Sequence, residues 1–363
     1  MKGANAITSK QMALYTFVCQ TGIGVITLPT VLAKEVGHDG WISVIITGFI
    51  AIAVAALIVF LLKKSSDKGI LDINKAIFGK VLGTGLNFLI FTYLLIATSA
   101  GTRAFLIFLR VSLFPLTPPI VMSLLVLMPS FYMVWYGLKT TARYKVFTIF
   151  SYAAVLVYIF ILYKEVRLSF LMPVGEAGIE QLLYSIKASY FSFVGLELIA
   201  VFYAEITDKD KVLKWHVLAN LFTMIFTAII TAASTAVFGE NFIAVQTLAL
   251  FNLFRIYNAM VLERVDLFMI AFWFFAMSCS VRAYMMASWY SLVKICKDKK
   301  SPIIYTIFIV LLLIISRIPR DVDQSFFFLD IVNYMGMGIT ILFILCLIIS
   351  AIKTKGGKTH KKS

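Results

Sequence analysis

Two glycines and a proline interrupt an apolar stretch near the N-terminus that is long enough to cross a bilayer. Residues Thr21 to Pro29 read TGIGVITLP. Gly is a poor helix former, and Pro removes a backbone hydrogen bond and clashes with the preceding turn. Within a membrane, irregular backbone survives only where it is buried in protein or lines a wet cavity. The stretch predicts either a kinked, closely packed helix or an unwound one whose bare N–H and C=O groups face a ligand.

An unwound segment here could bind a small zwitterion. Backbone N–H groups at Gly22 and Gly24 would face a carboxylate at the start of a half-helix, where the helix dipole favours an anion. The C=O groups of residues 19–21 could accept hydrogen bonds from an ammonium group. The alternative is that the glycines only allow close helix packing. A second interrupted helix at the matching place in the other half of the chain would favour binding.

Such a second helix is predicted at residues 181–203. Its segment SYFSFVGLE ends with Gly195 and Glu197 in the middle of the span. A carboxylate inside a membrane span is costly and marks a functional site by default. Glu197 could respond to protons, act as a gate, or form a buried pair with Lys187 or Arg282. Lys187 lies ten residues away on the same helix, about 15 Å at helical rise, which disfavours that pair.

Further side chains are candidates for the walls of the pocket. The candidates are Tyr93, Thr98 and Ser99 on the third span and Ser278, Cys279 and Ser280 on the eighth, and of these Tyr93 and Ser278 are preferred. Phe191 and Phe193 precede Gly195. Each of these residues could instead serve helix packing. The predicted substrate-binding residues are Thr21, Gly22, Ile23, Gly24, Thr27, Tyr93, Phe191, Phe193, Gly195 and Ser278, and Glu197 is the predicted proton-linked or gating residue.

The sequence predicts neither a metal site nor an enzyme. His38, His216 and His360 lie in or beside loops far apart in sequence, and no Walker A, HExxH or GxSxG pattern occurs. Four cysteines without a CxxC pair are expected to be free packing residues: Cys19, Cys279, Cys296 and Cys346. We therefore expect no catalytic residue, no metal and no cofactor.

The composition places these residues in a membrane. Hydrophobic residues make up 61% of the 363-residue chain, whereas a soluble domain is nearer half apolar. Met1 to Lys10 is too polar for a cleaved signal peptide. We predict an all-α polytopic membrane protein with one domain over residues 1–352 and a basic cytoplasmic tail over 353–363. The ten predicted spans are 10–33, 40–62, 82–108, 118–137, 143–163, 180–203, 214–238, 264–293, 302–318 and 327–352.

The positive charges predict the orientation. The net charge is +15, and the segments that are inside when the N-terminus is inside carry 22 of the 33 lysines and arginines, with Lys139, Arg143 and Lys145 counted in one inner loop. The outer segments carry nine, so both termini are predicted to be cytoplasmic. Residues 70–80 are expected to form an amphipathic helix along the inner surface. Residues 239–261 are expected to form short helices over the outer mouth.

Five spans per half give the second half the opposite orientation, as in an inverted repeat. The first repeat covers about residues 10–163 and the second about 180–352. The interrupted first and sixth helices then occupy equivalent positions, which points to a binding site at the midplane of the bilayer.

The motifs resemble those of a known family. Gly22 to Pro29 (GIGVITLP) and Phe193 to Glu197 (FVGLE) are similar to first- and sixth-helix motifs of the amino acid–polyamine–organocation transporter superfamily. Residues Glu35 to Trp41 (EVGHDGW), and Glu263 to Asp266 (ERVD) followed by Trp273, resemble the spore germination permeases, the B subunits of GerAB-type germinant receptors. The resemblance covers nearly the whole chain and implies a LeuT-like 5+5 inverted-repeat fold.

The resemblance also implies a function. The chain would be the B subunit of a spore germinant receptor in the spore inner membrane, binding a small nutrient, an amino acid by expectation, between helices one, three, six and eight. Its implied partners are receptor A and C subunits, and no nucleic acid. The alternatives are a proton-coupled amino acid transporter using Glu197 and a ligand-gated water or ion channel.

Overall fold

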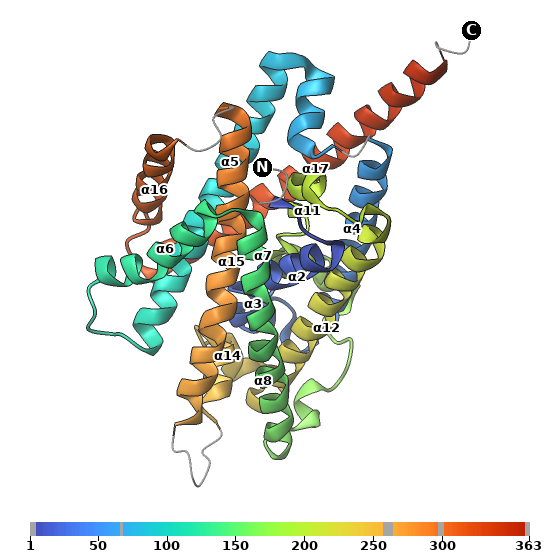
Figure 1. Cartoon of the computed structure of the whole chain (residues 1–363). Helices are drawn as coiled ribbons and strands as arrows, with labels where there is room; N and C mark the ends of the chain where they lie inside the picture. Colours follow the sequence, from blue (N-terminus) through green and yellow to red (C-terminus); the bar gives the residue numbers. More distant parts are fainter. Residues whose placement is uncertain (1–4, 66–67, 257–263, 297–300, 360–363) are drawn as a thin grey trace.

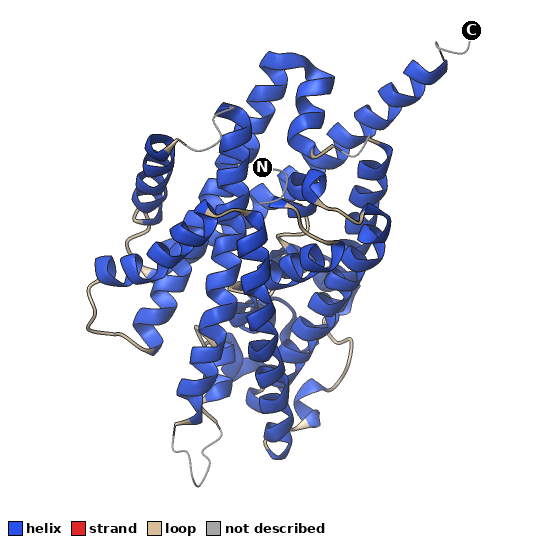
Figure 2. Ribbon diagram, viewed as in Figure 1, coloured by secondary structure: helices blue, strands red, loops and turns tan. Residues whose placement is uncertain are grey.

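The computed structural model describes residues 5–65, 68–256, 264–296 and 301–359, and the chain in these ranges is almost entirely helical (Figures 1 and 2). The helices of the first half are α2 (Ser9–Gln20), α3 (Gly24–Val36), α4 (Gly40–Lys64), α5 (Ile70–Ser112), α6 (Pro119–Trp135), α7 (Leu138–Tyr144) and α8 (Thr148–Ile161). Those of the second half are α9 (Gly178–Tyr184), α10 (Ile186–Tyr190), α11 (Leu198–Phe202), α12 (Val212–Phe238), α13 (Glu240–Ala244), α14 (Ala249–Phe254), α15 (Val265–Cys296), α16 (Pro302–Ser316) and α17 (Val322–Thr359).

Seven helical stretches in the described ranges are long and apolar enough to cross a membrane, and α6 and α16 are shorter apolar helices. One of the seven runs from Gly24 to Lys64 and contains both the end of the predicted first span and the second. The membrane-protein fold is therefore confirmed, and the number of ten spans stays a prediction.

The long helices form a bundle around the two interrupted ones. Helix α15 packs against α5 and α8, α12 packs against α4, and α17 packs against α5. The short helix α2 lies among them, in contact with both α12 and α15 (Figure 1). The N-terminus is fixed by one parallel bridge between Ile7 and Ile206, and Asp208 accepts hydrogen bonds from the Ser9 N–H and hydroxyl at the start of α2.

Several local expectations are met and others need correction. Gly79 adopts φ +77° and divides residues 70–78 from the rest of α5, and α13 and α14 are short helices after residue 239. Pro29 does not break its helix, because it lies inside α3. Helix α17 continues to Thr359 and includes part of the predicted tail. Glu263 lies outside the described residues.

Lys145 is a correction of a different kind. We counted it among the charges of an inner loop, but its side chain is only 1% exposed. Its Nζ donates to the Cys279 carbonyl of α15 at 2.7 Å and lies 4.0 Å from the centre of the Tyr15 ring. The charge therefore links α15 to α2 inside the bundle and carries no information on orientation.

Candidate functional site

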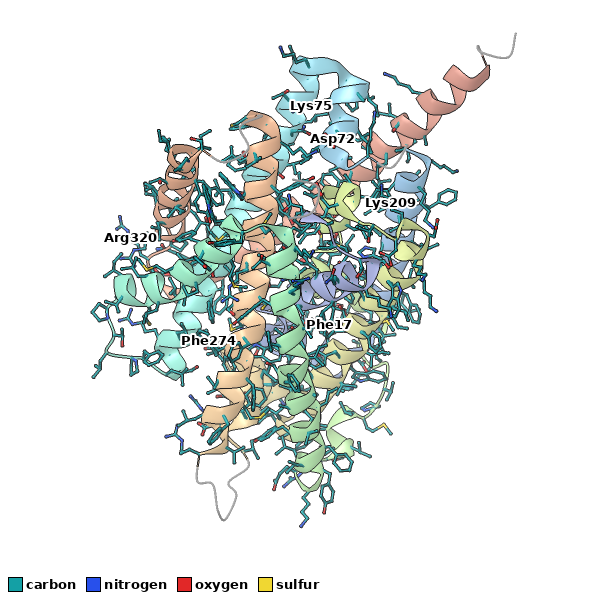
Figure 3. The ribbon with its side chains drawn as sticks, in the orientation of Figure 1. Phe17, Asp72, Lys75, Lys209, Phe274 and Arg320 are labelled. Carbon is teal, nitrogen blue, oxygen red and sulfur yellow. The ribbon has the colours of Figure 1, made fainter. Side chains whose placement is uncertain are left out.

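The first interrupted helix breaks at residues 21–23, between α2 and α3. The carbonyl of Cys19 accepts a hydrogen bond from the Ser280 hydroxyl at 2.8 Å, so α15 satisfies part of the open end of α2. The Thr21 hydroxyl donates a hydrogen bond to the carbonyl of Phe17, one helical turn earlier on α2. Figure 3 labels Phe17 near the centre of the molecule. At the other side of the break, the N–H groups of Gly24 and Val25 open α3 and precede its first helical hydrogen bond.

The second break lies between α10 and α11. A short 3₁₀ turn, Phe191–Phe193, leads into Val194 in an extended conformation and Gly195 at φ +119°. Only Gly adopts such a φ without strain, and a Cβ there would lie 3.0 Å from the Cys19 sulfur. The side-chain amide of Gln20 donates a hydrogen bond to the Phe193 carbonyl at 3.0 Å. The two breaks are therefore in direct contact.

Glu197 is bound by groups from α5, from α15 and from the sixth-helix break itself. Its carboxylate accepts a hydrogen bond from the Tyr93 hydroxyl of α5 at 2.7 Å and from the Gly195 N–H at 2.7 Å. The Tyr284 hydroxyl of α15 lies 3.4 Å from the same oxygen that Tyr93 contacts. The carboxylate is 1% exposed, and neither Lys187 nor Arg282 forms an ion pair with it. The Gly195 N–H can only donate, whereas the two tyrosine hydroxyls can donate or accept.

A small cavity of about 40 Å³ lies where the two breaks meet. It is bordered by α2 and α3, by α5, by the sixth-helix break, by α15 and by α17. The lining residues are Cys19, Gln20, Ile23, Gly24, Ala97, Gly101, Phe191, Val194, Ser280, Val281, Tyr284, Leu329 and Val332. A space of this size holds a few water molecules and is too small for an amino acid.

A larger cavity of about 460 Å³ adjoins it on the side of α3, α10 and the start of α17. We call this larger cavity the vestibule. Phe191 and Leu329 line both spaces and therefore form the partition between them. Charged side chains of both signs border the vestibule, among them Lys34, Glu35, Lys187 and Asp330.

The structure brings only part of the predicted set to the small cavity. Ile23, Gly24 and Phe191 line it, and Thr27 lines the vestibule instead. Tyr93 and Gly195 hold Glu197, and the carbonyl of Phe193 is occupied by Gln20.

Three other predicted residues point elsewhere. The hydroxyl of Thr21 contacts Tyr152 of α8 at 2.8 Å. Gly22 packs against α15, where an added Cβ would lie 2.4 Å from the Ser280 Cβ. Ser278 bonds back to the Phe275 carbonyl of its own helix and does not border the cavity.

Gln20, Ser280 and Tyr284 border the cavity. Sequence reasoning did not propose the side chains of Gln20 and Tyr284, and it considered Ser280 but preferred Ser278. Gln20 is a polar residue directly before the glycines, which was a usable signal. Ser280 and Tyr284 are four residues apart on α15 and so share one helix face. To choose correctly between Ser278 and Ser280, one must know which face of α15 points to the cavity. The sequence of an apolar helix with scattered polar residues does not show this.

The fold agrees with solved transporters of the LeuT class. A substrate-bound, outward-open Na⁺-coupled sialic acid symporter superposes with a TM-score of 0.70 at 16% identity, over 95% of this chain and 80% of that one. MhsT in complex with L-phenylalanine superposes with a TM-score of 0.59 at 15% identity, over 96% of this chain and 98% of that one.

Curated relatives are germination proteins. Spore germination protein GerQB of Bacillus cereus is 25% identical over 256 residues, covering 70% of this chain and 71% of the relative. Spore germination protein B2 of Bacillus subtilis (strain 168) is 23% identical over 342 residues and 92% of both chains. The family model described as spore germination protein matches residues 6–325. The chain, a membrane protein with a LeuT-like fold, therefore belongs to the spore germination protein family.

Proposed function

We propose that the chain is the membrane-embedded B subunit of a spore germinant receptor and binds a small nutrient, an amino acid in the first instance, where its two interrupted helices meet. The observation that carries this proposal is the position of Gly24. Gly24 opens α3, where no described residue accepts a hydrogen bond from the Gly24 or Val25 N–H. It also borders the cavity and lies next to the Phe191 ring. A carboxylate is the natural ligand of such a helix start.

Binding requires the partition to move. The cavity between the breaks is too small for an amino acid, so the germinant displaces Phe191 and Leu329 as it enters from the vestibule. Phe191 belongs to the turn that leads into Gly195, and Gly195 is bonded to Glu197. A shift of Phe191 would therefore alter the hydrogen bond between Glu197 and Tyr93 of α5. In this proposal Glu197 acts as a gate.

The proposed receptor function implies partner subunits and a location in the spore inner membrane. The change at the sixth-helix break would pass to receptor A and C subunits. The chain would lie in the spore inner membrane with both termini on the core side, as the positive-inside distribution favours.

The test is ligand-induced thermal stabilisation of the purified protein against amino acids, sugars and nucleosides, with two variants alongside. Gly24→Leu places a side chain against Phe191, whereas Gly85→Leu is a matched control on α5, where an added Cβ meets nothing within 4 Å. A ligand at a hundred times its Kd should stabilise the wild type and Gly85→Leu by about 2.7 kcal/mol. It should not stabilise Gly24→Leu. Equal stabilisation of both variants would contradict the proposed site.

A proton-coupled amino acid transporter is the second candidate, favoured by the buried carboxylate of Glu197 and by transporters of the same fold. Uptake into proteoliposomes separates the two. Saturable, proton-driven accumulation that is lost in Glu197→Gln would replace the pure receptor function with transport.

A further inference from the structure

Four arginines gather at the end of the bundle where α5 stops and α17 begins. Arg103 and Arg110 lie on α5, Arg317 follows α16, and Arg320 precedes α17. In the predicted orientation all four are outside, where the positive-inside rule disfavours Lys and Arg. They account for four of the nine cationic residues that we assigned to the outer segments. Figure 3 labels Arg320 at the left edge of the molecule, between α16 and α6.

These side chains surround one cavity of about 360 Å³, which we call the arginine pocket. Its charged lining is Arg103, Arg110, Arg320 and Asp321, and Arg317 is close enough to act electrostatically on Arg103. The remaining walls are apolar and come from α5, α6, the turn between them and the first residue of α17: Leu106, Ile107, Val111, Pro115, Pro119, Met122 and Val322.

Within the described part of the chain, Asp321 balances only part of the positive charge of the arginine pocket. None of its arginines forms an ion pair with a described carboxylate. Arg103 donates instead to the Arg320 carbonyl at 2.8 Å and to the Ser325 hydroxyl at 3.4 Å. Asp321, the one acid in the lining, accepts from the Gln324 N–H at 2.7 Å and caps α17. Like charges held together in this way favour an added anion.

The surroundings indicate what carries the anion. Leu116, in the turn between α5 and α6, is 96% exposed, and Val111 and Ile120 beside it are 56% and 51% exposed. Such residues suit the acyl region of a bilayer. Arginine forks match phosphate oxygens. A ligand with a phosphate and an acyl chain fits both parts of the lining.

We propose that the arginine pocket binds the phosphate of an anionic phospholipid. The lipid phosphate lies among Arg103, Arg110 and Arg320, and its acyl chains run along α5 and α6. Val322 borders both the arginine pocket and the vestibule, so the bound lipid fixes the start of α17 at the wall of the vestibule. The arginine pocket shares no lining residue with the small cavity between the two breaks.

The test titrates the purified full chain in neutral detergent with short-chain phosphatidylglycerol, phosphatidylcholine and inorganic phosphate, and follows the thermal transition. The double variant Arg110→Gln/Arg320→Gln removes two exposed guanidinium groups. Its matched control is Arg167→Gln/Arg255→Gln, which removes the same charge from residues that do not line the arginine pocket.

Phosphatidylglycerol should stabilise the wild type with half-saturation at least about tenfold below that of phosphatidylcholine. The pocket variant should abolish this preference, and the control should retain it. If inorganic phosphate stabilised the wild type at the same concentrations as phosphatidylglycerol, and the pocket variant lost this stabilisation, the pocket would be a site for free phosphate and the lipid proposal would be wrong. An undiminished phosphatidylglycerol effect in the pocket variant, or an equal effect of phosphatidylcholine, would overturn the proposal.

Discussion

Replacement of Gly22 by Ala should destabilise the fold through one contact with α15. A Cβ at Gly22 would lie 2.4 Å from the Ser280 Cβ and 2.7 Å from its hydroxyl oxygen. Carbon atoms in good contact are about 3.5–4.0 Å apart, so one of the two must move by roughly 1 Å or more. Neither end is flexible, because Ser280 lies on a buried stretch of α15 and donates to the Cys19 carbonyl. Overpacking of this kind costs about 1–3 kcal/mol.

The same geometry predicts a rescue by Ser280→Gly. That substitution alone costs about 1 kcal/mol for a Gly within a helix and about 1 kcal/mol for the lost hydrogen bond to Cys19. In the double variant, the alanine methyl group introduced by Gly22→Ala takes the space that the serine side chain has left. We therefore expect the double variant to lose about 1–3 kcal/mol less free energy of unfolding than the two single substitutions lose together.

The assay is reversible unfolding of the purified protein in mixed micelles, with the four proteins compared as a double-mutant cycle. Ser280→Ala provides the control, because it keeps the Cβ and should not rescue Gly22→Ala. Additivity within about 0.5 kcal/mol for Ser280→Gly would refute the reasoning, since it would mean that Gly22 is not held against Ser280.

Two further predictions concern hydrogen bonds to buried or capping carboxylates. Tyr93→Phe should lower the free energy of unfolding by about 1.5–3 kcal/mol, and Tyr284→Phe by less, because their hydroxyls lie 2.7 and 3.4 Å from Glu197. The same unfolding assay checks both, and an equal loss would contradict the ranking. Burial raises the pKa of Asp208, but its hydrogen bonds from Ser9 outweigh this and hold that pKa below its usual range. Its contribution to stability should be complete above about pH 4 and disappear as pH falls through the lower folded pKa. Thermal unfolding between about pH 3 and 6 should show this loss in the wild type and not in Asp208→Asn; parallel curves would contradict it.

The backbone breaks could be predicted from sequence because they depend on local chemistry. Gly22, Gly24 and Gly195 mark the two interrupted segments, and both breaks are present at these residues. Pro29 was a weaker guide. It lies in the second turn of α3, where only one helical hydrogen bond is lost.

The contacts between spans could not be predicted in the same way. Tyr93 and Glu197 were separate candidates, and only the packing of α5 against the sixth-helix break shows that they share a hydrogen bond. Lys145 was assigned to a loop because the polar stretch 139–143 precedes it, yet its side chain is buried against α15. The arginine pocket brings residues 103–110 next to residue 320. These residues are so far apart in sequence that no local pattern could predict their contact.

The labelling rate of Cys19 tests the central claim most directly. Its side chain borders the cavity between the breaks, and the other three cysteines, Cys279, Cys296 and Cys346, can be replaced by Ala. The rate of modification by a small methanethiosulfonate reagent is then measured with increasing amounts of the ligand found by thermal stabilisation. We predict a saturable fall in the labelling rate, with half-effect at the concentration that half-saturates the thermal shift. A ligand that stabilises the protein and leaves the labelling rate of Cys19 unchanged would place its site outside this cavity and contradict the account.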